Sequence, residues 1–175
     1  MHQSAKRLLL VCLVLAAAST PVIAAEREQV RIVINLMAGV KMPFPENLPR
    51  NKAKTQRVWL DYQGMSTVAC LRLEERRWCY EHIPPVGARA EMLRIRNEPV
   101  TGLLVGNLYH YVDDFDLDGS VDIGSTTRLE GQPHAPVGVV MQYFHRGANR
   151  GSDFRADYQK LYDDGIAVAL RYMGE

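Results

Sequence analysis

The chain has 175 residues, and its 21 lysines and arginines against 20 aspartates and glutamates give a formal net charge of +1. A charge so close to zero provides no strong field for nucleic acid or anionic lipid, so neither partner is expected. Basic residues cluster at 49–57 without a helical stripe or interleaved aromatics, which indicates a solvated surface.

Residues 1–25 have the layout of a secretory signal peptide. Lys6 and Arg7 precede an apolar stretch, and small residues follow at Ala24 and Ala25. Residues 19–21 interrupt the stretch, which falls short of the ~20 apolar residues of a membrane span, although an uncleaved anchor is the alternative. We expect cleavage after Ala24 or Ala25 and export to the periplasm or the extracellular space. A single mature domain, 26–175, then remains, with a net charge of −1 and no stable membrane span.

The mature chain reads mainly as short strands between turns. Strands are predicted at 30–37, 57–62, 65–73, 91–97 and 137–145, and 108–112 also has strand character. Three prolines within 41–51 indicate a loop, and 123–136 is also loop-like. Frequent alternation without long helical periods favours an antiparallel sheet.

Two cysteines of the mature chain are expected to face each other across a hairpin. If Glu74 and Glu75 form its tip, Leu71 lies opposite Trp78 and Cys70 lies opposite Cys79. Export favours a disulfide between them, and two free thiols are the alternative. The spacing is not that of a CxxC redox motif.

The C-terminal segment 152–175 predicts an amphipathic helix. Its apolar residues recur at steps of three and four: Phe154, Tyr158, Leu161, Tyr162, Ile166, Ala169, Leu170 and Met173. Gly165 costs ~1 kcal/mol in the interior of the helix and indicates close packing on a sheet. The predicted fold class is therefore α+β, a mainly antiparallel sheet with one C-terminal helix packed on it.

The segment DDFDLDGSVD, residues 113–122, carries the clearest chemical signal. From Asp114 onward, acidic side chains alternate along a tight turn. They are Asp114, Asp116, Asp118 and Asp122, with Gly119 and Ser120 between them. This spacing resembles the calcium loops of EF-hand and dockerin proteins. The resemblance implies that the four carboxylates and the Ser120 carbonyl bind Ca²⁺ and that Gly119 makes the bend.

The resemblance ends at the twelfth position, where an acidic ligand is expected and the chain has Ser125. The missing ligand could come from Asp113, from Glu130 or from water. No amphipathic helix follows the loop, which predicts a lone calcium loop on a sheet rather than a paired sensor. A solvated acidic turn without an ion is the alternative.

The inner FDLDGS also resembles the first motif of haloacid dehalogenase-type phosphatases, in which Asp116 would be the nucleophile and Asp118 its acid–base partner. Only 57 residues follow Asp118, too few for the rest of that three-layer fold.

Two function classes remain. The first is an exported calcium-binding module that stabilises a fold or binds an unidentified envelope or extracellular component. The second is a small exported hydrolase that holds a catalytic metal near a histidine. His82, His110, His134 and His145 lack any metal-site spacing, which favours the non-enzymatic module.

Overall fold

The computed structural model describes residues 26–40, 58–63, 65–100, 104–132, 135–148 and 150–173. The predicted signal peptide, the predicted loop at 41–51 and the basic segment 49–57 lie outside these residues. No helix among the described residues has the length and apolar character needed to cross a membrane.

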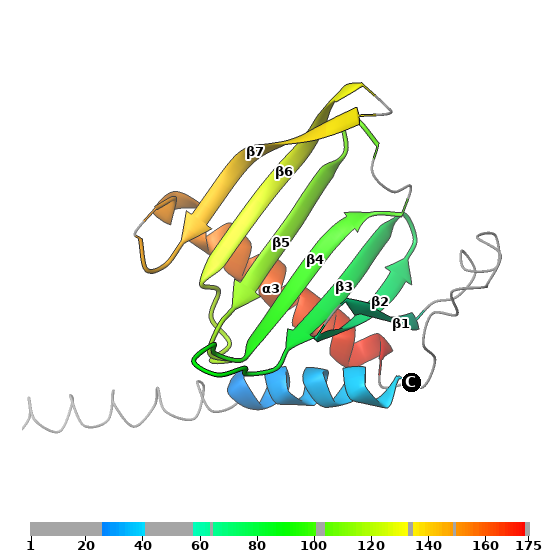
Figure 1. Cartoon of the computed structure of the whole chain (residues 1–175), viewed down its shortest axis with the longest axis vertical. Coiled ribbons are helices and arrows are strands. Elements are labelled where there is room, and N and C mark those ends of the chain that lie inside the picture. Colours follow the sequence, from blue (N-terminus) through cyan, green and yellow to red (C-terminus); the bar gives the residue numbers. More distant parts are fainter. Residues whose placement is uncertain are drawn as a thin grey trace, which may run out of the picture.

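Seven antiparallel strands form a sheet in which each strand pairs with the next one along the chain. They are β1 (Val58–Gln63), β2 (Ser66–Leu73), β3 (Arg76–Ile83), β4 (Met92–Pro99), β5 (Leu108–Asp114), β6 (Ile123–Gln132) and β7 (Ala135–His145). Figure 1 shows this meander, with β1 and β7 at its edges. The fold is α+β and mainly antiparallel, as predicted.

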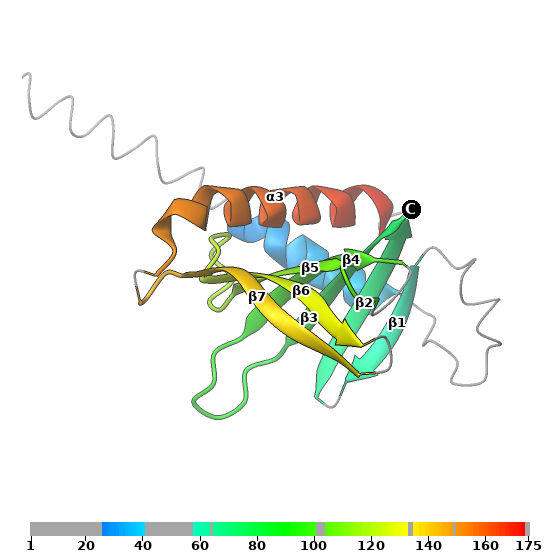
Figure 2. The same ribbon diagram turned by 90° about the horizontal axis from the view of Figure 1, so that it is seen from above.

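Two helices lie on the same face of the sheet (Figure 2). Helix α3 (Arg155–Tyr172) follows a short 3-10 turn, η1 (Ser152–Phe154), and another helix spans residues 26–39. Both helices share one apolar core with the sheet. Its buried members are Val30, Val33, Met37, Ala69, Tyr80, Leu93, Ile95, Val112, Leu117, Val121, Phe144, Tyr158, Tyr162, Ile166 and Ala169.

The helix at 26–39 shows that the prediction of a buried strand at 30–37 is wrong. Val30, Val33 and Met37 are at most 1% exposed, and their spacing is that of one helical face. Ile32, on another side of this helix, is 42% exposed. β-Branched residues favour strands only weakly, so the packing of an apolar stripe on the sheet outweighs their preference.

The prediction of a loop at 123–136 is also wrong, because β6 and the first residues of β7 occupy this segment. Gly124 in β6 lies under α3, and a Cβ atom added there would come 2.3 Å from the ring of Tyr158. A small residue is therefore required where the helix crosses the strand. This close approach accounts for Gly124, one of the residues that made the segment resemble a loop.

The β2–β3 hairpin has the predicted register, with Leu71 opposite Trp78 and Cys70 opposite Cys79. The Cα atoms of the two cysteines are 4.1 Å apart and their sulfur atoms 2.04 Å apart, at bonding distance. Glu74 at the tip has a φ of 52°, a left-handed conformation that glycine adopts more readily. Pairing of the two strands thus outweighs an unfavourable turn residue.

The predicted apolar stripe of α3 faces the sheet. Tyr158, Tyr162, Ile166 and Ala169 are buried, and Leu161 and Leu170 are partly buried against the same core. Gly165 allows the close packing that its position predicts, since a Cβ there would lie 2.9 Å from Ile95. The Tyr80 hydroxyl donates a hydrogen bond of 2.8 Å to the Gly165 carbonyl.

Replacing Ile166 by alanine should lower the free energy of unfolding by about 2–5 kcal/mol, because it leaves a cavity between α3 and the sheet. The matched control is Ile32→Ala, which removes the same atoms from a side chain that is 42% exposed. Denaturant unfolding of both variants measures the difference. Equal losses would contradict the assignment of Ile166 to the core.

Alkylation of the protein unfolded without reductant should leave Cys70 and Cys79 unmodified, because β2 and β3 place the two cysteines directly opposite each other, where a disulfide protects both. After reduction and unfolding, peptides containing these residues should each gain one alkyl group. Mass spectrometry of the two samples tests the pair. Two modified cysteines in the unfolded, unreduced protein would show free thiols.

Candidate metal centre

The acidic loop joins the end of β5 to the start of β6. Successive residues of a strand point to opposite faces, so Asp113 and Asp114 are directed away from each other. The carboxylate of Asp113 accepts two hydrogen bonds from Arg94, of 2.7 and 2.9 Å. The side chain of Asp114 instead points to the face that the helices cover. Asp114 is also the last residue of β5, directly before the loop.

Asp114 is completely buried and accepts three hydrogen bonds. The Tyr162 hydroxyl on α3 donates one of 2.7 Å, and the backbone N–H groups of Gly119 and Asp118 donate bonds of 3.0 and 3.2 Å. One carboxylate thus fixes the end of β5, the bend of the loop and the middle of α3 relative to one another.

Burial raises the pKa of Asp114 to about 6, although its three hydrogen bonds act in the opposite direction. Burial, followed by the adjacent Asp114 carboxylate, also raises the pKa of Tyr162, which keeps its hydroxyl protonated as a donor. Near neutral pH the ionised Asp114 therefore carries a desolvation cost that a bound cation would reduce.

Two residues of the loop adopt the left-handed backbone conformation. Gly119 has a φ of 87° and passes so close to the helix at 26–39 that an added Cβ would lie 2.8 Å from the Cβ of Glu26. Leu117 has a φ of 55°, which is rare for a residue with a side chain, and it is only 6% exposed. Burial of Leu117 in the core offsets the cost of its backbone.

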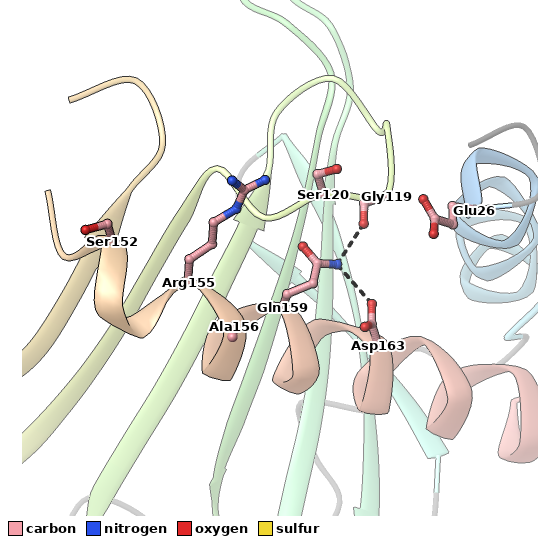
Figure 3. Close-up of a pocket in the computed structure, with 8 residues that line it drawn as sticks. All are labelled: Glu26, Gly119, Ser120, Ser152, Arg155, Ala156, Gln159 and Asp163. Carbon is pink, nitrogen blue, oxygen red and sulfur yellow. Dashed lines mark hydrogen bonds between the residues drawn. The ribbon is translucent and has the colours of Figure 1, made fainter. Parts of the chain in front are cut away.

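Gln159 on α3 also holds the loop in place (Figure 3). Its side-chain oxygen accepts a hydrogen bond of 3.0 Å from the Val121 N–H, and its side-chain nitrogen donates one of 2.9 Å to the Gly119 carbonyl. The same nitrogen donates to Asp163, one turn further along the helix. Helix α3 is therefore bonded to two backbone groups of the loop through Gln159, and to the carboxylate of Asp114 through Tyr162.

Three loop aspartates converge. Carboxylate oxygens of Asp114, Asp116 and Asp122 all lie within 4.8 Å of one another. Asp122 is oriented by a hydrogen bond of 2.8 Å from the Phe115 N–H to its Oδ2. Three acidic oxygen donors at this separation can surround a hard cation, and in its absence they repel one another.

Asp118 is directed toward Arg146, which follows β7. Nη1 of Arg146 lies 3.3 Å from Oδ2 of Asp118 and 3.5 Å from Oδ1 of Asp122. The other oxygen of Asp118 accepts a hydrogen bond of 2.7 Å from the Ser120 N–H. Burial would raise the pKa of Asp118, but the Ser120 amide and Arg146 outweigh it, so this pKa is lowered. Arg146 offsets part of the negative charge of the loop.

The predicted ligands are thus placed in different ways. Asp114, Asp116 and Asp122 come together, whereas Asp118 lies outside this group and contacts Arg146. Ser120 is next to the group, and the use of its carbonyl as a ligand stays a prediction. Ser125, at the twelfth position, is 1% exposed within β6.

Asp113 and Glu130, either of which the sequence allows as the missing twelfth ligand, both bind other side chains. Asp113 is bonded to Arg94, and Glu130 pairs with Arg128 near the other end of β6. Water or backbone oxygens would have to complete the coordination of an ion.

A groove of about 560 Å³ lies beside the loop. Figure 3 shows its lining residues, which are Glu26, Gly119, Ser120, Ser152, Arg155, Ala156, Gln159 and Asp163. They include no histidine and neither of the phosphatase-motif aspartates, Asp116 and Asp118. The loop also follows a strand whose two neighbours are antiparallel, unlike the central parallel strand of the phosphatase fold.

The three histidines that the structure describes have other contacts. His110 pairs with Thr126 at 3.0 Å, His82 with Glu91 at 2.7 Å, and Nδ1 of His145 accepts the Ala148 N–H at 2.9 Å. The fourth, His134, lies outside the described residues. These contacts provide no support for the hydrolase alternative.

Sequence reasoning did not identify Tyr162, Gln159 and Arg146 as parts of this site. Tyr162 belongs to the predicted apolar stripe, but periodicity does not say where its hydroxyl points. Arg146 lies 24 residues after Asp122, and only the pairing of β6 with β7 brings it to the loop.

Comparisons with protein-family models, with curated proteins and with solved structures found no match to this chain.

The raised pKa of Asp114 predicts the pH dependence of stability in EDTA. The folded protein holds this proton more tightly than the unfolded chain does, so the resulting stabilisation is complete below about pH 4 and is lost as pH rises through about 6. Asp114→Asn removes the titration. The unfolding free energy of the parent minus that of this variant should therefore decrease between pH 4 and 7.

Chemical denaturation across this range measures the difference. Asp153→Asn, at an exposed position in η1, is the control and should show a much weaker trend. A difference between the parent and Asp114→Asn that grows with pH would contradict the prediction.

Proposed function

We propose that the loop 114–122 binds Ca²⁺ and that the protein is an exported, calcium-stabilised structural or binding module of the cell envelope or extracellular space. The observation that carries this proposal is the convergence of Asp114, Asp116 and Asp122, with oxygens within 4.8 Å of one another. The resemblance of their spacing to EF-hand and dockerin loops supports it independently.

The donor set suits calcium better than magnesium. Ca²⁺ accepts six to eight oxygens in irregular arrangements, including carboxylates, carbonyls and water. Mg²⁺ requires nearly octahedral geometry and releases its water reluctantly. The three aspartates differ in exposure, since Asp114 is buried and Asp116 is exposed. Such an irregular set of oxygens, completed by water, is compatible with calcium.

The contacts of the loop favour a stabilising role for the ion. Asp114 is bonded to α3 and Gly119 lies against the helix at 26–39, so an ion held here would connect both helices to the sheet. It would also reduce the repulsion among the carboxylates.

The compartment agrees with this role. The signal-peptide pattern predicts export, and cysteines at bonding distance suit an oxidising environment. Calcium sites in extracellular modules function with dissociation constants as weak as ~0.1–1 mM. Three convergent carboxylates, fewer than the resembling loops have, suit an affinity in this weak range.

Calcium should raise the melting temperature of the purified protein. At 100 times the dissociation constant, a ligand specific for the folded state adds about 2.7 kcal/mol of stability. For a domain of this size that corresponds to a shift of roughly 5–10 °C. Magnesium at the same concentration is the control for ionic strength and should give a smaller shift.

Asp116→Asn is the sharpest variant, because Asp116 is exposed and its replacement leaves the buried hydrogen bonds of Asp114 intact. It should abolish most of the calcium shift, whereas Asp153→Asn, which removes one charge at an exposed site elsewhere, should preserve it. Isothermal titration of the three proteins checks binding directly. Identical calcium responses in all three would refute the assignment of the site.

A further inference from the structure

Among the residues that the structure describes, none pairs with the outer edge of β7 along residues 137–142, whereas the edge is closed beyond them. His145 exchanges backbone hydrogen bonds with Arg150, with N···O distances of 2.9 and 3.3 Å. Gly151 passes so close to the Tyr143 carbonyl that an added Cβ would lie 1.9 Å from its oxygen. The chain thus folds back over the end of β7, and Figure 1 shows no described strand beside the rest of its outer edge.

The free part of this edge is apolar and uncharged. Val137 is 62% exposed, Val139 37%, Val140 59% and Met141 46%, and no charged residue occurs between positions 137 and 144. Edge strands of soluble proteins are usually protected by charges, by proline or by a covering element. Here Pro136, which has no N–H to donate, precedes the stretch, and a bulge at Met141, which has no partner on β6, ends it; residues 137–140 between them form a regular strand.

The hydrogen-bonding direction along this edge follows from β6. Leu129 donates its N–H to Asn107 and accepts from the Gly106 N–H, so both of its backbone groups point toward the β5 side. Its partner on β7 is Gly138, which must therefore direct its own N–H and C=O outward. Val140, two residues further along the same regular stretch, also points outward.

We propose that two copies of this chain associate by antiparallel pairing of residues 137–141 of β7 about a two-fold axis at Val139. Each Gly138 then exchanges hydrogen bonds with Val140 of the other copy, and the two Val139 side chains meet at the axis. Val137 lies opposite Met141 on both sides. Each copy thus offers the other the same backbone donors, backbone acceptors and apolar side chains, as a two-fold interface requires.

Pairing of β7 with β7 of a second copy fits better than pairing of β7 with β1 of a second copy. Pairing of β7 with β1 would leave one free edge at each end and would extend indefinitely. Pairing of β7 with β7 is closed. It also places the acidic loops, which follow β5 near the other end of β7, at opposite ends of the joined strands, where they do not repel each other.

The size of the edge predicts a weak dimer. The four side chains present roughly 250–500 Å² of apolar surface for two copies, taking ~60–120 Å² for a fully exposed side chain of this kind. Backbone pairing and flanking residues add to this, but the total stays near or below the ~1,200 Å² lower limit of stable interfaces. A dissociation constant in the micromolar range is therefore expected, and the monomer remains folded.

Sedimentation equilibrium of the purified protein from about 1 to 300 μM tests the proposal, with micromolar weak association expected for an interface of this size. The average mass should rise toward twice that of the monomer and stop there. Amide exchange at Gly138 and Val140 should slow as the protein concentration rises. Amides of β4, in the middle of the sheet, should not respond.

Val139→Lys places two like charges at the axis and should weaken association at least about tenfold. Val86→Lys makes the same change at a residue of similar exposure, 45%, in the turn between β3 and β4, and should dimerise like the parent. A parent that stays monomeric at 300 μM, assemblies larger than a dimer, equal effects of the two lysines, or concentration-independent exchange at Gly138 would overturn the proposal.

Discussion

The hydrogen bond from the Tyr162 hydroxyl to Asp114 joins α3, β5 and the acidic loop at one buried point. It is 2.7 Å long, lies in the interior and joins the middle of α3 to the last residue of β5. A buried carboxylate without donors would be strongly unfavourable, so the helix, the strand and the Gly119 bend must all be placed together. The orientation of the acidic loop depends on this arrangement.

The loop is consequently part of the core. Leu117 and Val121 bury their side chains in the same apolar cluster as the two helices, and Gln159 binds the loop backbone. An ion bound by the neighbouring carboxylates would act on the free energy of the whole fold. Such a site differs from a mobile lid, whose ordering would leave the rest of the molecule unaffected.

Both proposals concern the region of β5, β6 and β7, at opposite ends. Arg146 follows β7 and donates its backbone N–H to the Asp122 carbonyl, while the other end of the strand carries the exposed apolar edge. The helices cover the sheet near the acidic loop, and the outer part of the β6–β7 hairpin extends past them (Figure 1). One end of the hairpin is therefore fixed by packing and the other is accessible to a second strand.

The sequence by itself determined the features that arise from local geometry. The hairpin register that pairs Cys70 with Cys79 follows from a two-residue tip, the apolar stripe of α3 follows from the helical period, and the alternate acids of the loop are visible directly. Only the tertiary structure decided that residues 30–37 are helical and that β6 is a strand. The first segment has β-branched residues but gains more by packing a helical stripe on the sheet. In the second, Gly124 is required within a strand because Tyr158 leaves no space above it. Tyr162 and Arg146 join the acidic loop for the same reason, because contacts between residues distant in the chain depend on how whole elements pack.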